Sequence, residues 1–367
     1  MLLKSVTGME TKMDGADELT LIQHPDSTEE IPVLDIAPYI AGEPGARERI
    51  GAKLREIAET IGFFYLVGHG MQQSVIDGVF AQSKRFNQLP VETRRRMPRR
   101  TRGGYDAVED KIAEAHPDDP PISLRSSYHV YREREPGHPL LDANHPYRLP
   151  NDWPDFLPGF REPVLEYLNG VEQVGLSMMP LWAAALDLPA DYFAPSFREP
   201  YLAMSLIHYP SQEPQENPLF GIKPHTDNTV MTILALGDVP GLAVRMPSGH
   251  WKVAEPMTGA FMVNTGNSLT RWTNGRFLST KHHVINMTGQ ERYSIPLFFG
   301  ADLDAKIECL PTCQSAEKPA QFPPITYQEL QDWYFFNNGY LQKSVGPGSK
   351  SDGTWGEAPT KRQNSAA

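Results

Sequence analysis

Cysteine is almost absent from the chain, and what there is lies close together near the C-terminal end. Only Cys309 and Cys313 are present among 367 residues. A disulfide-stapled secreted scaffold needs several pairs, so that class is excluded. A tetrahedral zinc site would need further ligands, and no second cysteine pair exists to provide them. We therefore expect free thiols in a reducing compartment, which favours a cytoplasmic location.

The sequence also lacks long apolar runs and any excess of positive charge. No stretch approaches the roughly 18 consecutive apolar residues of a membrane-spanning helix, and the N-terminal segment has no apolar core typical of a secretory signal. Asp and Glu number 45 against 34 Lys and Arg, which gives a net charge of −11. This acidity argues against nucleic acid and anionic membrane surfaces as partners.

The hydrophobic content of 40% is sufficient for a large core. Residues 1–29 are polar and aperiodic and are interpreted as a flexible lead-in, and residues 346–367 as a disordered tail. Between them we expect a single domain over residues 30–345. Its expected parts are a helix-rich N-terminal part at 30–200, a β-rich core at 201–300 and a C-terminal helical part at 301–345.

Hydrophobic periodicity divides this domain into helices and strands. The predicted helices cover residues 45–60, 71–89, 160–186 and 326–340. The predicted strands include residues 31–34, 63–67, 124–131 and 202–209. Residues 106–121 contain a cluster of turn-forming residues and are predicted to be a loop.

A dense basic run follows the second predicted helix. Its arginines are Arg94, Arg95, Arg96, Arg99, Arg100 and Arg102. One interpretation is a patch that binds an anionic substrate or nucleic acid. The other is a solvated helix end and loop, which is favoured because the chain as a whole is acidic and Pro98 breaks a helix.

The strongest candidate for a chemical site is the His225-x-Asp227 pair, followed later by His282. Residues i and i+2 of a strand point to the same face, so His225 and Asp227 can bind one ion from a single extended segment. Two imidazoles and one carboxylate make a facial triad, which leaves positions open on Fe(II). An isolated His-x-Asp pair also occurs by chance, and many lone histidines only complete a hydrogen bond in a core.

Bringing His282 to this pair requires a second strand beside the first. Residues 280–287 can form that strand, after turns marked by Gly249 and by Asn274-Gly275, and the latter dipeptide predicts a hairpin. A small antiparallel barrel would return the distant histidine to the same opening. Adjacent strand residues point to opposite faces, so only one of His282 and His283 can face the metal.

The segments around these positions resemble a known family. GAFMVNTGNSL at 259–269 and TNGRFLSTKHHV at 273–284 are similar to the isopenicillin-N-synthase-like family, which contains Fe(II)- and 2-oxoglutarate-dependent dioxygenases. IPVLD at 31–35 and GFFYLVGHG at 62–70 are similar to its N-terminal signature. The resemblance runs from about residue 30 to about residue 340.

The resemblance implies both a ligand set and a fold. It implies that His225, Asp227 and His282 hold the iron, and it selects His282 over His283. The implied architecture is mainly β with flanking helices (α+β), built on a double-stranded β-helix or jelly-roll core. Closing such a barrel also covers the exposed edges of its sheets.

A cosubstrate site follows from the same resemblance. Arg292 and Ser294 would clamp the distal carboxylate of 2-oxoglutarate, a role that suits a guanidinium fork and a hydroxyl donor. Tyr209 aligns with a tyrosine that helps to position the cosubstrate. Where the family frequently has Asn two residues earlier, this chain has Ile207.

The implied activity is oxidation of an unactivated C–H bond of a small molecule by O2, with decarboxylation of 2-oxoglutarate to succinate and a role in secondary metabolism. Hydroxylation is the default outcome, and desaturation or cyclisation needs only a different substrate pose. Candidates for substrate contact are Arg125, Tyr128, His129, Trp272 and Phe298. Two alternatives remain: an oxidase of the same fold that does not use 2-oxoglutarate, and a non-catalytic binding protein of that fold.

Overall fold

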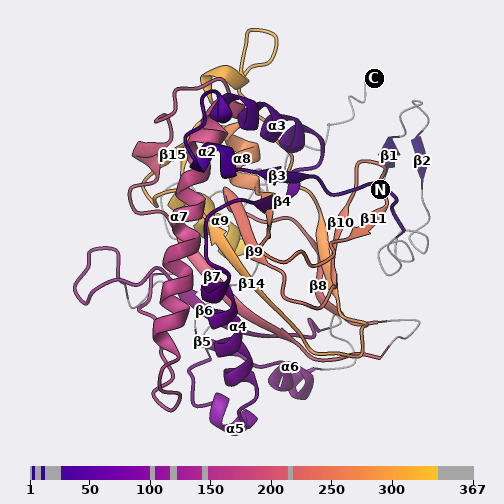
Figure 1. The fold of residues 1–367 in the computed structure, drawn as a ribbon, viewed down its shortest axis with the longest axis vertical. Helices are drawn as coiled ribbons and strands as arrows, with labels where there is room; N and C mark the ends of the chain where they lie inside the picture. Colours follow the sequence, from indigo (N-terminus) through magenta and orange to yellow (C-terminus); the bar gives the residue numbers. More distant parts are fainter. Residues whose placement is uncertain are drawn as a thin grey trace, which may run out of the picture.

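Two β-sheets form the centre of the protein, as seen in a computed structural model (Figure 1). The structure describes residues 2–4, 10–12, 26–99, 104–115, 122–142, 148–213 and 218–337. The predicted disordered tail and most of the predicted lead-in lie outside these residues, as do Arg100 and Arg102. The expected division of the chain into a lead-in, one domain and a tail stays a prediction.

The larger sheet has eight strands in the order β3-β4-β12-β9-β14-β7-β6-β5. Their bounds are β3 Val33–Asp35, β4 Phe63–Val67, β12 Phe261–Thr265, β9 Met231–Ala235, β14 Arg292–Phe299, β7 Leu202–Tyr209, β6 Ser126–Tyr131 and β5 Gly104–Asp106. Neighbours are antiparallel except β3 and β4. Every residue of β7 is buried, so neither face of this strand is exposed to bulk solvent.

The smaller sheet has four strands in the order β11-β10-β13-β8. Their bounds are β11 Trp251–Val253, β10 Leu242–Arg245, β13 His282–Ile285 and β8 Phe220–His225. The chain enters this sheet at β8, passes through β9 of the larger sheet, and returns for β10 and β11. This alternation between two antiparallel sheets builds the jelly-roll core that the resemblance implied.

Three helices cover the outer face of the larger sheet: α3 (Ala46–Thr60), α4 (Gln73–Asn87) and α7 (Arg161–Ala185). In α3, Ile50, Leu54 and Ile57 are buried, which is the helical spacing read from the sequence. α7 approaches β14 closely at Gly175, where an added Cβ would lie 2.6 Å from the Phe299 ring. The three helices therefore pack on one face of the larger sheet, and the opposite face is left to line a cavity.

The remaining elements are short. The helices are α2 (Ala37–Ile40), α5 (Val91–Arg94), α6 (Val108–Glu114), α8 (Asn267–Trp272) and α9 (Tyr327–Asn337), with 3-10 turns at Ala194–Ser196 and Pro311–Cys313. The strand pairs are β1 (Leu2–Lys4) with β2 (Glu10–Lys12), and β15 (Lys306–Ile307) with β16 (Ile325–Thr326). No helix in the described part of the chain is long and apolar enough to cross a membrane.

Two local predictions are wrong. Residues 108–114 form helix α6 and not a loop, because the turn-forming cluster begins only after this stretch. Asn274-Gly275 does not form a hairpin. It follows the C-terminal end of α8, where Asn274 and Gly275 take left-handed φ values of 55° and 75°. Asn-Gly readily adopts positive φ, and this conformation occurs at the C-terminal ends of helices as well as in hairpin turns.

The basic run does not form an open cationic patch among the residues that the structure describes. Arg94, Arg95 and Arg99 pair with the acidic side chains of α6 at Glu109, Asp110 and Glu114. Helix α6, which the sequence did not predict, thus supplies the carboxylates that pair with the preceding arginines.

Candidate metal centre and cosubstrate pocket

The two triad histidines lie opposite each other on neighbouring strands. His225 is the last residue of β8 and His282 is the first of β13, and the two are register partners. Their ring centroids are 4.2 Å apart. Asp227 lies two residues beyond the end of β8, outside the strand itself.

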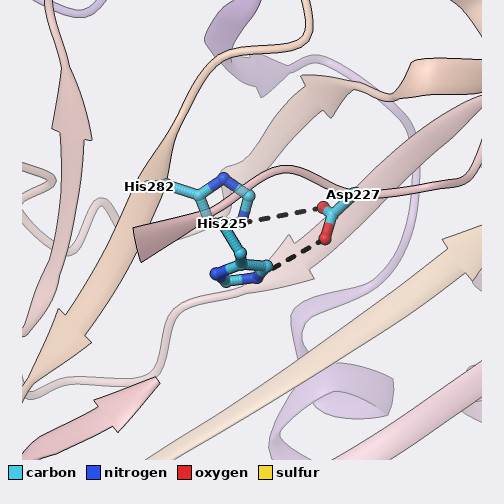
Figure 2. Close-up of side chains that lie close together, drawn as sticks. All are labelled: His225, Asp227 and His282. Carbon is cyan, nitrogen blue, oxygen red and sulfur yellow. Dashed lines mark ion pairs between the residues drawn. The ribbon is translucent and has the colours of Figure 1, made fainter. Parts of the chain in front are cut away.

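Three ligand atoms, one from each side chain, lie within 4.8 Å of one another (Figure 2). His225 Nε2 is 3.7 Å from Asp227 Oδ1, and His282 Nε2 is 3.7 Å from Asp227 Oδ2. Spacings of this size suit atoms that surround one ion at about 2 Å each. The sequence prediction that these three side chains converge is therefore matched by their positions.

Backbone carbonyls fix the orientation of both imidazoles. His225 Nδ1 lies 2.8 Å from the Lys223 carbonyl, and His282 Nδ1 lies 3.1 Å from the Thr280 carbonyl. A carbonyl oxygen only accepts, so each Nδ1 carries the hydrogen and donates. Each Nε2 lone pair is then left for a metal, which is the arrangement typical of ligating histidines.

The carboxylate is oriented by the larger sheet. Thr232 Oγ1 of β9 donates to Asp227 Oδ2 at 2.6 Å, and Asn264 Nδ2 of β12 donates to the same oxygen at 2.9 Å. Asp227 is 5% exposed, so both hydrogen bonds are made away from bulk water. The sequence motif contained Asn264, but only the structure shows that its side chain contacts the Asp227 carboxylate.

The electrostatics of the site favour a neutral His225 and an ionised Asp227. Burial, followed by the charge of His282, lowers the pKa of His225 to about 4, so its imidazole is neutral at physiological pH. For Asp227, burial acts to raise the pKa. The charges of the two histidines and the hydrogen bonds from Thr232 and Asn264 outweigh burial and lower the pKa.

A cavity of about 910 Å³ opens beside the triad. One of its walls comes from alternate residues of three neighbouring strands of the larger sheet, because alternate side chains of a strand share a face. The positions on this wall are Arg125, Ser127 and His129 at β6, Ala203, Ser205, Ile207 and Tyr209 on β7, and Arg292, Ser294, Pro296 and Phe298 on β14. Gln331, Tyr334 and Phe335 of α9 also line the cavity.

Arg292 is a buried cation whose side chain faces this cavity. It is 1% exposed, and burial lowers the pKa of its guanidinium. Its Nε donates to the Val239 carbonyl at 3.1 Å, whereas Nη1 has no hydrogen-bond partner within the described ranges. A buried charge that is left open in this way favours an anion from outside the described residues.

The surroundings of Arg292 leave room for such an anion. The guanidinium lies 4.7 Å from the ring centre of Tyr209, its register partner. The Tyr209 hydroxyl is close enough to act against the lowering of the Arg292 pKa, but it makes no hydrogen bond of normal geometry in the described structure. Gly241 lies against the arginine, and a Cβ there would be 3.1 Å from Arg292 Cδ. The donor set therefore fits a dicarboxylate such as 2-oxoglutarate.

Two of the candidate substrate contacts do not face the cavity. Tyr128 points to the other side of β6 and packs on Phe86 and Phe160 beneath the helices. Trp272 packs in the core near Phe193. Arg125, His129 and Phe298 do line the cavity. The sequence analysis missed Ser127 and Ser205, which become visible only when the register of β6 and β7 is known.

Family comparisons agree with this geometry. Residues 31–156 match the model described as non-haem dioxygenase in morphine synthesis N-terminal, and residues 201–301 match the 2OG-Fe(II) oxygenase superfamily. The chain is similar to the 2-oxoglutarate-Fe(II) type oxidoreductase hxnY of Emericella nidulans, with 32% identity over 82% of this chain and 87% of that protein. The chain belongs to the 2OG-Fe(II) oxygenase superfamily.

Solved structures of this superfamily share the fold. T7H of Neurospora crassa in complex with alpha-KG and thymine has a TM-score of 0.71 and 26% identity, over 83% of this chain and 96% of that one. A putative 2OG-Fe(II) oxygenase family protein of Caulobacter crescentus has a TM-score of 0.73 and 27% identity, over 85% and 100%. The expected jelly-roll fold is confirmed.

The comparisons also confirm the class of activity. The protein is a non-haem oxygenase that uses Fe(II), 2-oxoglutarate and O2. These assignments favour the first of the three functions considered from the sequence over a 2-oxoglutarate-independent oxidase or a non-catalytic binding protein.

Proposed function

We propose that His225, Asp227 and His282 are the iron ligands of this oxygenase, and that the enzyme oxidises a C–H bond of a small molecule held in the adjoining cavity. The observation that carries the proposal is the convergence of the three ligand atoms within 4.8 Å, with both Nδ1 atoms already committed to backbone carbonyls. When bound, iron and 2-oxoglutarate supply the activation of O2, coupled to conversion of 2-oxoglutarate to succinate and CO2.

The cosubstrate site proposed here lies on the larger sheet. Arg292 would bind the distal carboxylate of 2-oxoglutarate with its open Nη1, and Ser294, on the same face of β14, would add a hydroxyl donor. The Tyr209 hydroxyl, which has no partner in the described residues, is placed to complete the cradle. Ile207 contributes only an apolar wall at the position where the family frequently has Asn.

The remaining cavity is proposed as the substrate site. His129, Arg125 and Phe298 line it, and Phe335 of α9 closes one side. Burial of Asp227, His282 and Arg292 limits the access of water to the reacting region, which strengthens the electrostatic contacts there. Hydroxylation is the default outcome, and desaturation or ring closure would follow from another substrate pose. A cytoplasmic location and a role in secondary metabolism are further parts of this proposal.

The test measures succinate formation and substrate loss together, in the presence of Fe(II) and 2-oxoglutarate under air. Equal amounts of succinate and oxidised product are expected, with neither formed when 2-oxoglutarate is omitted. Product formation without 2-oxoglutarate would instead indicate an oxidase. Absence of iron binding in an anaerobic titration would indicate a binding protein.

A further inference from the structure

A second cationic side chain in the cavity has no role in the site described so far. Arg125 immediately precedes β6 and lines the cavity on the same face as Ser127 and His129. Its Nε is buried without a hydrogen-bond partner, and no carboxylate among the described residues pairs with its guanidinium. The Arg125 guanidinium is therefore available to bind an anion, which the described residues do not supply.

The two other basic side chains that line the cavity near Arg125 do have carboxylate partners. Arg99 and Lys111 also line the cavity, but Arg99 pairs with Glu114 and Lys111 pairs with Asp106 at 2.6 Å. Lys111 Nζ in addition donates to the Arg125 carbonyl at 2.9 Å, which fixes the backbone from which the Arg125 side chain extends. Within the described residues, the cations around Arg125 are thus neutralised while Arg125 itself is not.

Iron and cosubstrate do not neutralise Arg125 either. With neutral histidines, the charges of a ferrous ion, Asp227, dianionic 2-oxoglutarate and Arg292 cancel. Arg125 and the exposed Lys223, another lining residue without a carboxylate partner in the described ranges, then remain as net positive charge.

We propose that the substrate of this oxygenase is an organic anion, and that Arg125 binds its carboxylate or phosphate group while Lys223 attracts it at the cavity rim. The inference rests on the proposed function. A side-on contact through Nε and a terminal nitrogen would use the open edge of the guanidinium fork. His129 and Ser205, whose Nδ1 and Oγ atoms are 2.9 Å apart, offer a polar wall for the middle of the molecule. Phe298 faces its apolar part.

The test compares acids with their neutral analogues in the full-length enzyme loaded with Fe(II) and saturating 2-oxoglutarate. Phenylacetate, cinnamate and octanoate are each paired with the primary amide, and phenyl phosphate provides the phosphate arm. Anaerobic binding is followed by the shift of the metal-to-cosubstrate absorption band and by thermal stabilisation, and succinate formation is measured under air. The variants are Arg125→Gln, Arg125→Lys and Arg245→Gln. Arg245, on β10, has no carboxylate partner in the described structure and does not line the cavity.

The wild type should bind at least one acid more tightly than its amide. Arg125→Gln should weaken that acid by about 10- to 100-fold, the usual effect of losing a charge-assisted contact, and should leave the amide almost unchanged. Arg125→Lys should recover part of the loss, and Arg245→Gln should behave as wild type. A stronger response to phenyl phosphate than to the carboxylates would assign the anion as a phosphate ester.

Three results would overturn the inference. The wild type could respond equally to acids and amides, or to neither. The preference for the acid could survive Arg125→Gln, or Arg125→Gln could lower the affinity for 2-oxoglutarate and leave the affinity for the acid intact. The last result would move Arg125 into the cosubstrate site. Failure of the proposed function is distinguishable, because the wild type would then bind neither iron nor 2-oxoglutarate in the absence of any acid.

Discussion

The two sheets contribute different chemistry to the same cavity. The four-stranded sheet carries His225 and His282, whose rings are oriented by nearby backbone carbonyls. The eight-stranded sheet carries Tyr209 and Arg292, and here the cation is fixed by burial and by one hydrogen bond, with a donor left open. The smaller sheet therefore presents imidazole nitrogens to the proposed metal site, and the larger sheet presents positive charge to anions.

This difference means that the two kinds of binding can be damaged separately. A change in the triad should remove metal affinity but leave the buried cation in place. A change at Arg292 removes the anion contact but leaves the ligand atoms converged. Asp227 links the two sheets, because it follows a strand of the smaller sheet and accepts hydrogen bonds from the larger one.

The largest effect is expected for Asp227→Ala. Loss of an outer-shell partner of a ligand typically costs about 10- to 100-fold in metal affinity, so loss of the ligand itself should cost at least about 100-fold and abolish turnover. Iron titration and succinate formation measure this, with circular dichroism to show that the fold is kept. Asp304→Ala, which removes an exposed carboxylate, is the matched control. Retained turnover in Asp227→Ala would contradict the assignment of the triad.

Arg292→Ala should weaken the binding of 2-oxoglutarate without changing the binding of iron. Removal of a charge-assisted contact should lower 2-oxoglutarate affinity by about 10- to 100-fold. Iron should still bind as in the wild type, because no ligand atom is changed. Anaerobic titration with 2-oxoglutarate after iron loading measures the effect. Unchanged 2-oxoglutarate affinity would place the carboxylate clamp elsewhere.

Asn264→Ala tests the link between the sheets. The side chain lies on β12 but donates to Asp227 Oδ2 at 2.9 Å, so its removal should lower iron affinity by about 10-fold. Asn267→Ala, which changes a 3.3 Å hydrogen bond to Thr226 in the neighbouring segment, is a suitable comparison. If the two variants bound iron equally, orientation of the carboxylate by the larger sheet would have no role in metal binding.

The smallest effect is expected for Tyr209→Phe. The ring that lies over Arg292 is kept and only the hydroxyl is lost, so the KM for 2-oxoglutarate should rise by about 3- to 10-fold, as for one neutral hydrogen bond. Iron affinity should not change. Steady-state kinetics at saturating iron provides the measurement, and an unchanged KM would remove the hydroxyl from the proposed cradle.

The triad could be predicted from the sequence because its signal is local and surrounded by recognisable segments. His225 and Asp227 are two residues apart, and the family motif selects His282 over its neighbour. The structure shows why the selection is physically consistent: His282 faces His225 across the strand pair, whereas His283 packs against Trp251 and Phe220. The predicted single strand through Asp227 was less accurate, since β8 ends at His225.

Features that depend on distant partners could not be predicted in this way. Tyr128 and His129 are adjacent in a strand, and only the placement of the helices decides that Tyr128 is in the core and His129 in the cavity. The open state of Arg125 depends on where all nearby carboxylates lie, including Asp106 and Glu114, which stand close to or in helix α6. That helix was predicted to be a loop.

The most direct test of the central claim is an anaerobic Fe(II) titration of the wild type beside His282→Ala and His283→Gln. Convergence of His225, Asp227 and His282 on one ion predicts that the wild type and His283→Gln each bind a single ferrous ion with similar affinity. It predicts that His282→Ala loses most of that affinity while its circular dichroism spectrum stays the same. Wild-type iron affinity in His282→Ala, or its loss only in His283→Gln, would contradict the claim.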